Sequence, residues 1–361
     1  MRRGIHSLVA GVALPVLFGC GSEPLQRGTD SATPLAATQE NISFISEGLT
    51  LVGTLTVPAR NAGERVPGVV LIAGSGPESR DEVLAGQLGM SFGFNLPVFE
   101  QLAAALTDAG FAVLRYDKRS CGTFNGCADN EYPLPPDSTT IEDYVADVDA
   151  ALDFLESRTE VELTQVSVVG HSEGASYVPR LLESRQELQS GVMLSGPYNP
   201  IDVIIAQQTQ FLEQLLTDAG TDPATITRDL APLNDELAAL ALMRAGTYEG
   251  GSVGGAYPPF WTSLMALGDA APATSAEVAR PLLAVGGSYD WNVPLSELAR
   301  WQDNFANSSN PDQRDVVALD CMTHALNCVA QPDYHLIQDA DIGRTLDPDL
   351  APAVVSFLRS H

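Results

Sequence analysis

Short apolar runs alternate with segments of helical periodicity along most of the chain. Apolar, β-branched runs lie at residues 69–72, 166–169, 191–194 and 281–285. Between the first two, the pair Thr139 and Glu142 has capping-box spacing and opens a helix whose apolar residues are Ile141, Tyr144, Val145, Val148, Leu152 and Leu155. This alternation predicts an α/β fold, a mostly parallel central sheet with helices on both faces.

A long stretch separates the run at 191–194 from the run at 281–285, too long for an ordinary crossover. Residues 201–219 and 229–245 are amphipathic and predict helices, followed by a glycine-rich segment and the aromatic residues Tyr257, Phe260 and Trp261. We interpret 198–277 as a helical lid inserted between core segments 41–197 and 278–361, because loops at the carboxyl ends of such strands carry binding surfaces. The alternative is a packing subdomain without substrate contact.

The first residues predict export. A basic start, Arg2 and Arg3, precedes an apolar run at 5–18 that is too short to span a bilayer, which is typical of a secretory leader over 1–19. Residues 17–20 resemble a lipoprotein cleavage site at which Cys20 is acylated. Residues 20–40, rich in small and polar residues, then form a flexible tether. We therefore expect a lipoprotein of the bacterial envelope, on the periplasmic or outer-surface side, held to the membrane through Cys20 alone.

Charge excludes one class of partner. The 361 residues contain 19 basic and 46 acidic side chains, a net charge of −27. Removal of 1–19 takes away Arg2 and Arg3 and makes this −29, with 17 basic against 46 acidic residues. Such a field repels nucleic acid and anionic lipid surfaces. The expected partner is a small molecule.

Four cysteines remain after Cys20. Cys121 with Cys127 and Cys321 with Cys328 are plausible disulfides in an oxidising envelope, although four cysteines permit three pairings. Zinc fits less well because these spacings are wider than the usual knuckle. We expect no metal or cofactor.

The pentapeptide at 170–174, Gly-His-Ser-Glu-Gly, lies between a predicted strand and a segment that continues as a helix to Leu182. A strand-to-helix turn this tight leaves no room for side chains at Gly170 and Gly174, and it exposes the hydroxyl of Ser172. This placement predicts that Ser172 is a nucleophile.

A serine nucleophile needs a base. Of five histidines, His6 lies in the leader, His361 ends the sequence, and His171 is in the turn with its side chain directed away from Ser172. His324, which follows a short strand candidate at 315–319, is favoured over His335 further along.

The base in turn needs an acid. Asp290 follows the apolar run that ends at residue 287. The alternative for Asp290 is an N-terminal cap of the next helix, a role that Asn292 could also fill. The order Ser172, Asp290, His324, each just beyond a strand, is that of α/β-hydrolases.

Two backbone N–H groups would stabilise an oxyanion. Glu173, directly after Ser172, supplies one, and the glycine-rich turn at 73–77 supplies the other through Ser75, with Gly76 next. A phosphate-binding P-loop is excluded because the only lysine, Lys118, lies elsewhere.

Several stretches of the sequence match the pattern of a known family. They are 51–58, 74–77 with Arg80, Asp81 and Glu82 close behind, 115–119, the turn at 170–174, 286–294 and the His324 segment. On these the chain, from about residue 41 onward, resembles bacterial α/β-hydrolases of the EstD-type carboxylesterase group and, more distantly, serine aminopeptidases and dienelactone hydrolases. Two positions depart from the pattern: Ala73 stands where many members carry histidine, and Thr323 where asparagine is expected.

Three functions are compatible with these residues. The first is hydrolysis of small or medium carboxylic esters through a Ser-His-Asp triad. The second is a serine aminopeptidase or amidase of the same fold. The third, least favoured, is an envelope lipoprotein that keeps the fold as a binding module, since all three triad candidates are present.

Overall fold

The computed structural model describes residues 34–83, 96–121, 127, 135–329 and 345–361. The predicted leader, Cys20 and His335 lie outside the described residues. Within the described part, none of the helices combines the length and the apolar character needed to cross a membrane.

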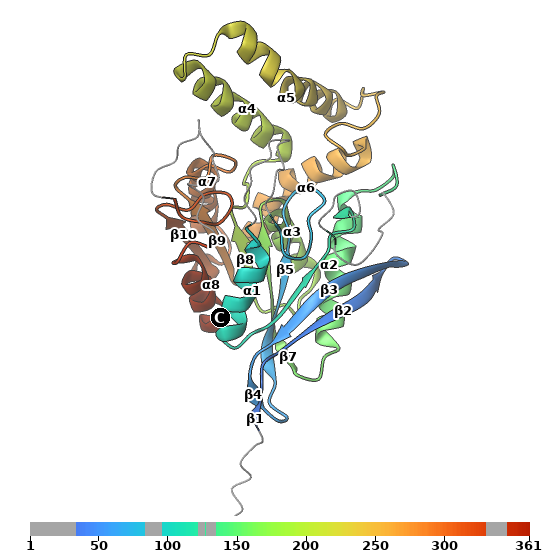
Figure 1. Ribbon diagram of the computed structural model, residues 1–361, viewed down its shortest axis with the longest axis vertical. Helices are drawn as coiled ribbons and strands as arrows, with labels where there is room; N and C mark the ends of the chain where they lie inside the picture. The colour runs from blue at the N-terminus through green and yellow to red at the C-terminus, as the bar shows by residue number, and fades with distance from the viewer. Residues whose placement is uncertain (1–33, 84–95, 122–126, 128–134, 330–344) are drawn as a thin grey trace, which may run out of the picture. The chain divides into compact units, whose positions relative to one another are not determined.

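An eight-stranded mixed sheet forms the centre, in the order β10-β9-β8-β7-β5-β6-β3-β2 (Figure 1). Pairings from β10 through to β6 are parallel, whereas β3 pairs antiparallel with both β6 and β2. The prediction of a mostly parallel sheet is confirmed. The strands are β2 (Thr38–Ser46), β3 (Leu49–Val57), β5 (Val66–Ile72), β6 (Ala112–Tyr116), β7 (Val161–His171), β8 (Gly191–Leu194), β9 (Leu282–Gly287) and β10 (Arg314–Leu319), and β1 (Pro34–Leu35) pairs separately with β4 (Arg60–Asn61).

Helices cover both faces, because alternate strand residues point to opposite sides. On β5, Val70 and Ile72 join one apolar core with the first helix set below, while Val69 and Leu71 join a second core with the other set. The first set is α2 (Ile141–Glu156), α3 (Glu173–Ser184), α6 (Pro258–Glu277) and α7 (Leu295–Ala306), and the second is α1 (Val98–Asp108) and α8 (Leu350–Ser360).

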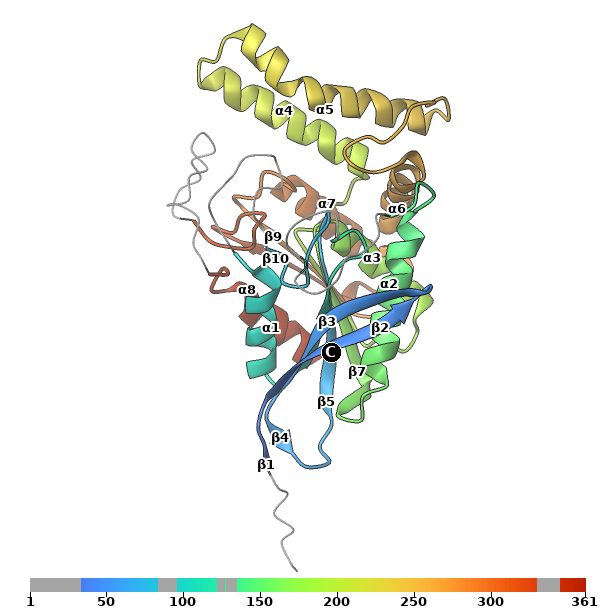
Figure 2. The ribbon, with the colours of Figure 1, turned by 45° about the vertical axis from the view of Figure 1, so that its right-hand side comes forward.

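The insertion differs in part from the prediction. Helices α4 (Ile201–Asp218) and α5 (Pro223–Arg244) form a hairpin beyond the carboxyl ends of the parallel strands (Figures 1 and 2). Helix α5 starts six positions before the expected residue 229, because the Asp222 side chain caps it, accepting from the Thr225 N–H at 3.1 Å. Helix α6 buries Trp261 and Leu264 in the core, which also includes Ile205 of α4 and Leu240 of α5.

Two smaller expectations were wrong. The capping box of α2 is formed by Thr140 and Asp143, one position after the expected pair Thr139 and Glu142. Within the expected tether at 20–40, residues 34–35 lie in β1 and residues 38–40 lie in β2.

Candidate active site

The turn at 170–174 joins β7 to α3 and strains its central residue. Ser172 has φ +52° and ψ −117°, a conformation that non-glycine residues rarely adopt. A Cβ on Gly170 would lie 2.2 Å from the Gly174 carbonyl oxygen, and one on Gly174 would lie 2.3 Å from that of Ile72. Both glycines are therefore required by close backbone approach, as the sequence argument supposed.

Ser172, His324 and Asp290 meet at the carboxyl ends of β7, β10 and β9. Ser172 Oγ lies 3.0 Å from His324 Nε2, and His324 Nδ1 lies 2.9 Å from Asp290 Oδ2. The Asp290 side chain is fully buried, whereas 20% of the His324 side chain is exposed. Such a chain of contacts lets a histidine accept the serine proton while the carboxylate fixes its tautomer. The structure brings the three predicted residues together, and their catalytic role remains a prediction.

The alternative role of Asp290, an N-terminal cap of the next helix, does not fit the geometry. Pro294, not Asp290 or Asn292, is the N-cap of α7. The second oxygen of Asp290 accepts from the Val293 N–H at 2.8 Å, which orients the carboxylate. Asp320, the carboxylate that follows β10, is exposed, and its backbone carbonyl accepts a hydrogen bond from the Ser288 hydroxyl.

His324 lies in a loop closed by a disulfide. Cys321 and Cys328 are bonded to each other at the two ends of what we call the histidine loop, residues 321–328. Inside it, the Thr323 N–H donates to the Asn327 carbonyl at 2.8 Å, and the Thr323 hydroxyl accepts from the Ala325 N–H at 3.2 Å. Threonine in place of the expected asparagine thus takes part in the local turn.

A buried contact between His171 and Glu82 supports the histidine loop, and sequence reasoning missed it. His171 Nδ1 lies 2.8 Å from Glu82 Oε1, and its Nε2 lies 2.9 Å from the backbone carbonyl of His324. Burial lowers the pKa of His171, but the Glu82 carboxylate and both hydrogen bonds outweigh it, and the net pKa is raised. When the ring is protonated it donates at both nitrogens, and it then links the turn at 170–174 to the backbone of His324.

The glycine-rich turn after β5 lies directly against Ser172. A Cβ on Gly74 would be 3.2 Å from Ser172 Cβ. Ser75 and Gly76 follow on an exposed stretch of the same turn. Glu173 begins α3, so its N–H has no carbonyl in a preceding turn of the helix. All three predicted donors thus belong to segments that border the Ser172 hydroxyl.

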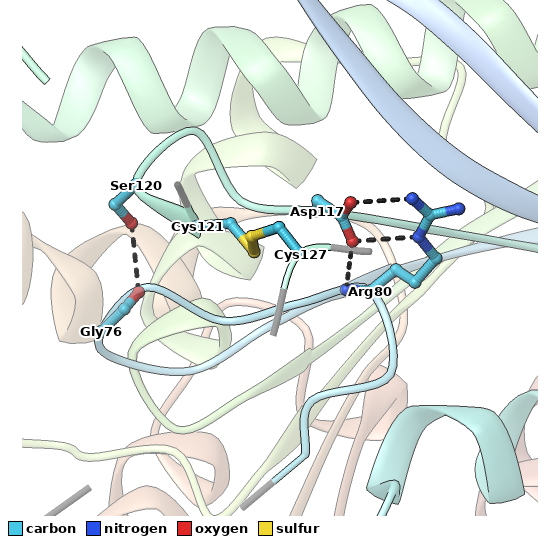
Figure 3. Close-up of a disulfide and its surroundings, with 6 residues drawn as sticks. All are labelled: Gly76, Arg80, Asp117, Ser120, Cys121 and Cys127. Carbon is cyan, nitrogen blue, oxygen red and sulfur yellow. Dashed lines mark hydrogen bonds and ion pairs between the residues drawn. A yellow bond between two sulfur atoms is a disulfide. The ribbon is translucent and has the colours of Figure 1, made fainter. Parts of the chain in front are cut away.

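A second loop braces this turn (Figure 3). We call residues 74–80 the oxyanion loop and residues 117–121, after β6, the lysine loop. Arg80 makes a bidentate ion pair with Asp117, at 3.0 and 2.8 Å, and the Ser120 hydroxyl donates to the Gly76 carbonyl at 3.2 Å. The lysine loop itself ends in the second disulfide, Cys121–Cys127. Both disulfide pairings favoured by the sequence are therefore present.

One group of described side chains has metal-ligand spacing. The sulfurs of Cys321 and Cys328 and a carboxylate oxygen of Asp347 lie within 4.8 Å of one another. A sulfur committed to a disulfide is not a thiolate and is a poor metal ligand. This group is better described as a disulfide beside an aspartate.

Comparison with known proteins identifies the family. Residues 95–326, well over half of the chain, match the family described as serine aminopeptidase, S33. The chain belongs to this family. The S33 chain is also 32% identical to the esterase EstD of Thermotoga maritima over 166 residues, which is 46% of the S33 chain and 35% of EstD. The aligned part thus spans about a third of that relative.

Solved structures agree on the fold of the S33 chain. It is similar to the α/β-hydrolase GrgF of a Penicillium species, with a TM-score of 0.53, 15% identity and coverage of 90% of this chain and 99% of that one. An esterase of Pyrococcus furiosus gives a TM-score of 0.52 at 14% identity, covering 92% and 98%. The S33 chain has the α/β-hydrolase fold expected from its resemblance, within a family of serine hydrolases that includes esterases and aminopeptidase-like relatives.

Proposed function

We propose that this chain is a carboxylesterase that cleaves small or medium acyl esters through an acyl-enzyme intermediate. The observation that carries the proposal is the pair of contacts from Ser172 through His324 to Asp290, at 3.0 and 2.9 Å. The similarity to an esterase at 32% identity supports an ester over other acyl compounds.

In acylation, Ser172 Oγ attacks the ester carbonyl carbon while its proton passes to His324 Nε2. Asp290 stabilises the imidazolium that forms. The tetrahedral intermediate then expels the alkoxide oxygen, which takes the proton from His324 and leaves as the alcohol. The acyl group stays on Ser172.

In deacylation, water takes the place of the alcohol. His324 removes a proton from the water, whose oxygen attacks the acyl carbon, and the proton returns to Ser172 Oγ as the carboxylic acid leaves. During both steps the carbonyl oxygen carries negative charge. The N–H groups of Glu173 and Ser75, with Gly76 as the next choice, would donate to it.

An aminopeptidase or amidase is the second candidate. The family description, serine aminopeptidase, favours it, and the same residues cleave amides when His324 protonates the amine leaving group. The two functions differ in the leaving group and in what holds it, so they are separated by substrates and not by the triad.

The test is a turnover panel of p-nitrophenyl esters of increasing acyl length beside aminoacyl p-nitroanilides, run on the wild type and Ser172→Ala. We expect turnover of short and medium esters, and loss of about 10³-fold or more in the variant. A fluorophosphonate should label Ser172 in the wild type. Turnover of anilides alone would favour the aminopeptidase. The absence of both turnover and labelling would favour a binding lipoprotein.

We also propose that the protein is an exported envelope lipoprotein. The two disulfides support an oxidising compartment. Cys20→Ser should then abolish lipid incorporation, which mass spectrometry of membrane-extracted protein would measure. A mature chain that starts elsewhere and carries no lipid would contradict the proposal.

A further inference from the structure

The only lysine of the chain is buried beside the nucleophile. Lys118, in the lysine loop after β6, is 6% exposed. Burial of an ammonium costs several kcal/mol unless the charge is paired and its protons are bonded. Lys118 is therefore not a solvated surface lysine, and its buried position must be explained by its contacts.

Those contacts reach both segments that border the Ser172 hydroxyl. Lys118 Nζ donates to the backbone carbonyl of Gly74 at 2.7 Å and to Glu173 Oε1 at 2.7 Å. The ammonium also lies 5.0 Å from the ring centre of Tyr144. The lysine thus bridges the oxyanion loop after β5 and the first residue of α3 after β7.

The contact with Gly74 has a geometric consequence. In a trans peptide the C=O and N–H bonds of one unit point in opposite directions within a plane. The carbonyl of Gly74 and the N–H of Ser75 belong to the same peptide unit, so an anchor on the Gly74 oxygen fixes the direction of the Ser75 N–H. On its other side, Gly74 donates its own N–H to Glu82 Oε1 at 2.7 Å. Both peptide units that flank Gly74 are therefore held by buried charged groups.

The contact with Glu173 acts on the second donor. Its carboxylate is 4% exposed and is shared between Lys118 and the Tyr177 hydroxyl. These two contacts hold the side chain of Glu173, whose backbone N–H comes directly after Ser172. An ammonium on the Gly74 carbonyl also polarises that peptide, which makes the Ser75 N–H a stronger donor.

We propose that Lys118 is a positioning residue of the oxyanion hole, which orients the Gly74–Ser75 peptide and holds Glu173 so that both N–H groups face the developing oxyanion. The inference rests on the proposed function, because it presupposes a Ser172 acyl-transfer reaction. Burial lowers the pKa of Lys118, but the Glu173 carboxylate and the other contacts raise it above its usual value, so the group stays cationic at neutral pH.

The first experiment separates positioning from burial of charge. Lys118→Met removes the ammonium and leaves Glu173 unpaired, so it should lose both stability and kcat. The double variant Lys118→Met, Glu173→Gln removes both charges, and we expect it to recover stability. It should not recover kcat, which we expect to stay roughly 10- to 100-fold below wild type with KM within a few-fold, somewhat less than direct removal of one oxyanion donor.

The matched control is another buried cation that donates to backbone carbonyls. Arg314 contacts the carbonyls of Ser275 and Arg280 at 2.9 and 2.8 Å, at the amino ends of β9 and β10. Arg314→Met should lower the melting temperature and leave kcat within about twofold of wild type. Recovery of kcat in the double variant would overturn the inference, because it would show that Lys118 only neutralises Glu173.

A pair of inhibitors supplies a readout of the oxyanion itself. A trifluoromethyl ketone forms a charged hemiketal with Ser172, whereas the methyl ketone of the same alkyl chain binds uncharged. The double variant should lose affinity for the first in proportion to kcat/KM and bind the second as the wild type does. Equal losses for both ketones would overturn the inference.

Wild-type protein gives a test that needs no variant. Isotope labelling of lysine yields one side-chain signal, since the chain has one lysine. Phosphonylation of Ser172 places an oxygen at the two N–H groups, and the Lys118 signal should shift, with no shift in treated Ser172→Ala. An unmoved signal with Ser172 fully labelled would overturn this inference alone. Failure of the fluorophosphonate to label the folded wild type at Ser172 would overturn the proposed function and the inference with it.

Discussion

The carboxyl edge of the sheet and the α4–α5 hairpin lie next to each other but are built differently. The edge buries five titratable residues, among which Glu82 contacts His171 and Glu173 contacts Lys118, and the fifth is Glu78. In α4, by contrast, only Ile204, Ile205 and Thr209 are buried. Groups that react must hold their geometry before substrate arrives, whereas groups that select substrate can adapt to it.

The hairpin nevertheless contacts the loop that carries the acid. Phe211 of α4 stacks on Trp291, with ring centres 5.4 Å apart, and the Gln208 amide donates to the Asn292 carbonyl at 2.9 Å. These contacts follow Asp290 directly in the chain. Under the proposed function, we therefore expect the edge to perform the chemistry and the hairpin to influence which acyl chains reach it.

The largest effect should come from the edge. His324→Ala and Asp290→Asn should each lower turnover by about 10³-fold or more, because one removes the base and the other its orienting charge. Steady-state kinetics with a short ester would measure this, and His335→Ala serves as the control, within a few-fold of wild type. A near-normal Asp290→Asn enzyme would mean that another carboxylate orients His324.

The next effect concerns the disulfide of the histidine loop. Cys321→Ser with Cys328→Ser removes the disulfide that closes the loop around His324. This should cost roughly 2–3 kcal/mol of stability in the chain-entropy model. Because a displacement of about 1 Å can cost about a hundredfold in rate, we expect turnover to fall roughly 10- to 100-fold at a temperature at which the fold survives.

The matched control is Cys121→Ser with Cys127→Ser. It removes a disulfide that closes a loop of similar length beside the oxyanion loop. It should reduce mainly the free energy of unfolding. Circular dichroism melts and turnover, measured on both variants at one temperature, separate the two disulfides. Full turnover in the Cys321, Cys328 variant would show that the His324 position does not depend on the disulfide.

Sequence reasoning found the parts of the site that depend on local pattern. The turn around Ser172, the strand before Asp290 and the loop of His324 are each visible within about ten residues. The supporting contacts are not, because they join residues far apart in the chain: Glu82 contacts His171 across 89 positions, and His171 contacts the His324 carbonyl across 153. The sequence showed Lys118 as the only lysine, but nothing local indicated that it would meet Gly74 and Glu173.

The packing of the insertion could not be predicted from the sequence for a related reason. Amphipathic periodicity identified α4 and most of α5, but it does not say what an apolar face packs against. The aromatic cluster of Phe260 and Trp261 was therefore assigned to the lid, although it belongs to α6 and packs in the core. Tertiary contacts decided this assignment.

A smaller, selective effect should come from the hairpin. Phe211→Ala removes the stacking on Trp291 and should change the ratio of kcat/KM between long and short acyl esters by several-fold, because even one methylene in an apolar pocket is worth about 1–3 kcal/mol. Turnover of the acetyl ester should stay within about twofold. Leu242→Ala, on an exposed site of α5, is the control and should leave the ratio unchanged. A uniform loss on all esters after Phe211→Ala would assign the hairpin to the chemistry instead.

The last comparison concerns the dependence of stability on pH, to which the buried Glu78 of the edge should contribute. Burial, and then the nearby Glu82 carboxylate, raise the pKa of Glu78 to about 8 from its ordinary value of 4.5, against the opposing influence of Lys118 and His171. Between these two values the folded protein binds a proton at Glu78 that the unfolded chain has released. The free energy of unfolding must therefore fall as pH rises from about 4.5 to about 8 and level off above that.

Glu78→Gln keeps the neutral form at every pH, so it should remove this part of the slope while leaving the stability near pH 5 almost unchanged. Urea unfolding of the wild type and variant at several pH values across the window measures it, and Glu249→Gln, on an exposed segment after α5, controls for loss of an acidic residue. If the wild type and Glu78→Gln lose stability in parallel as pH rises, Glu78 is ionised in the folded protein. In that case the edge would bury a third carboxylate, Glu78, beside Glu82 and Glu173, which contact His171 and Lys118.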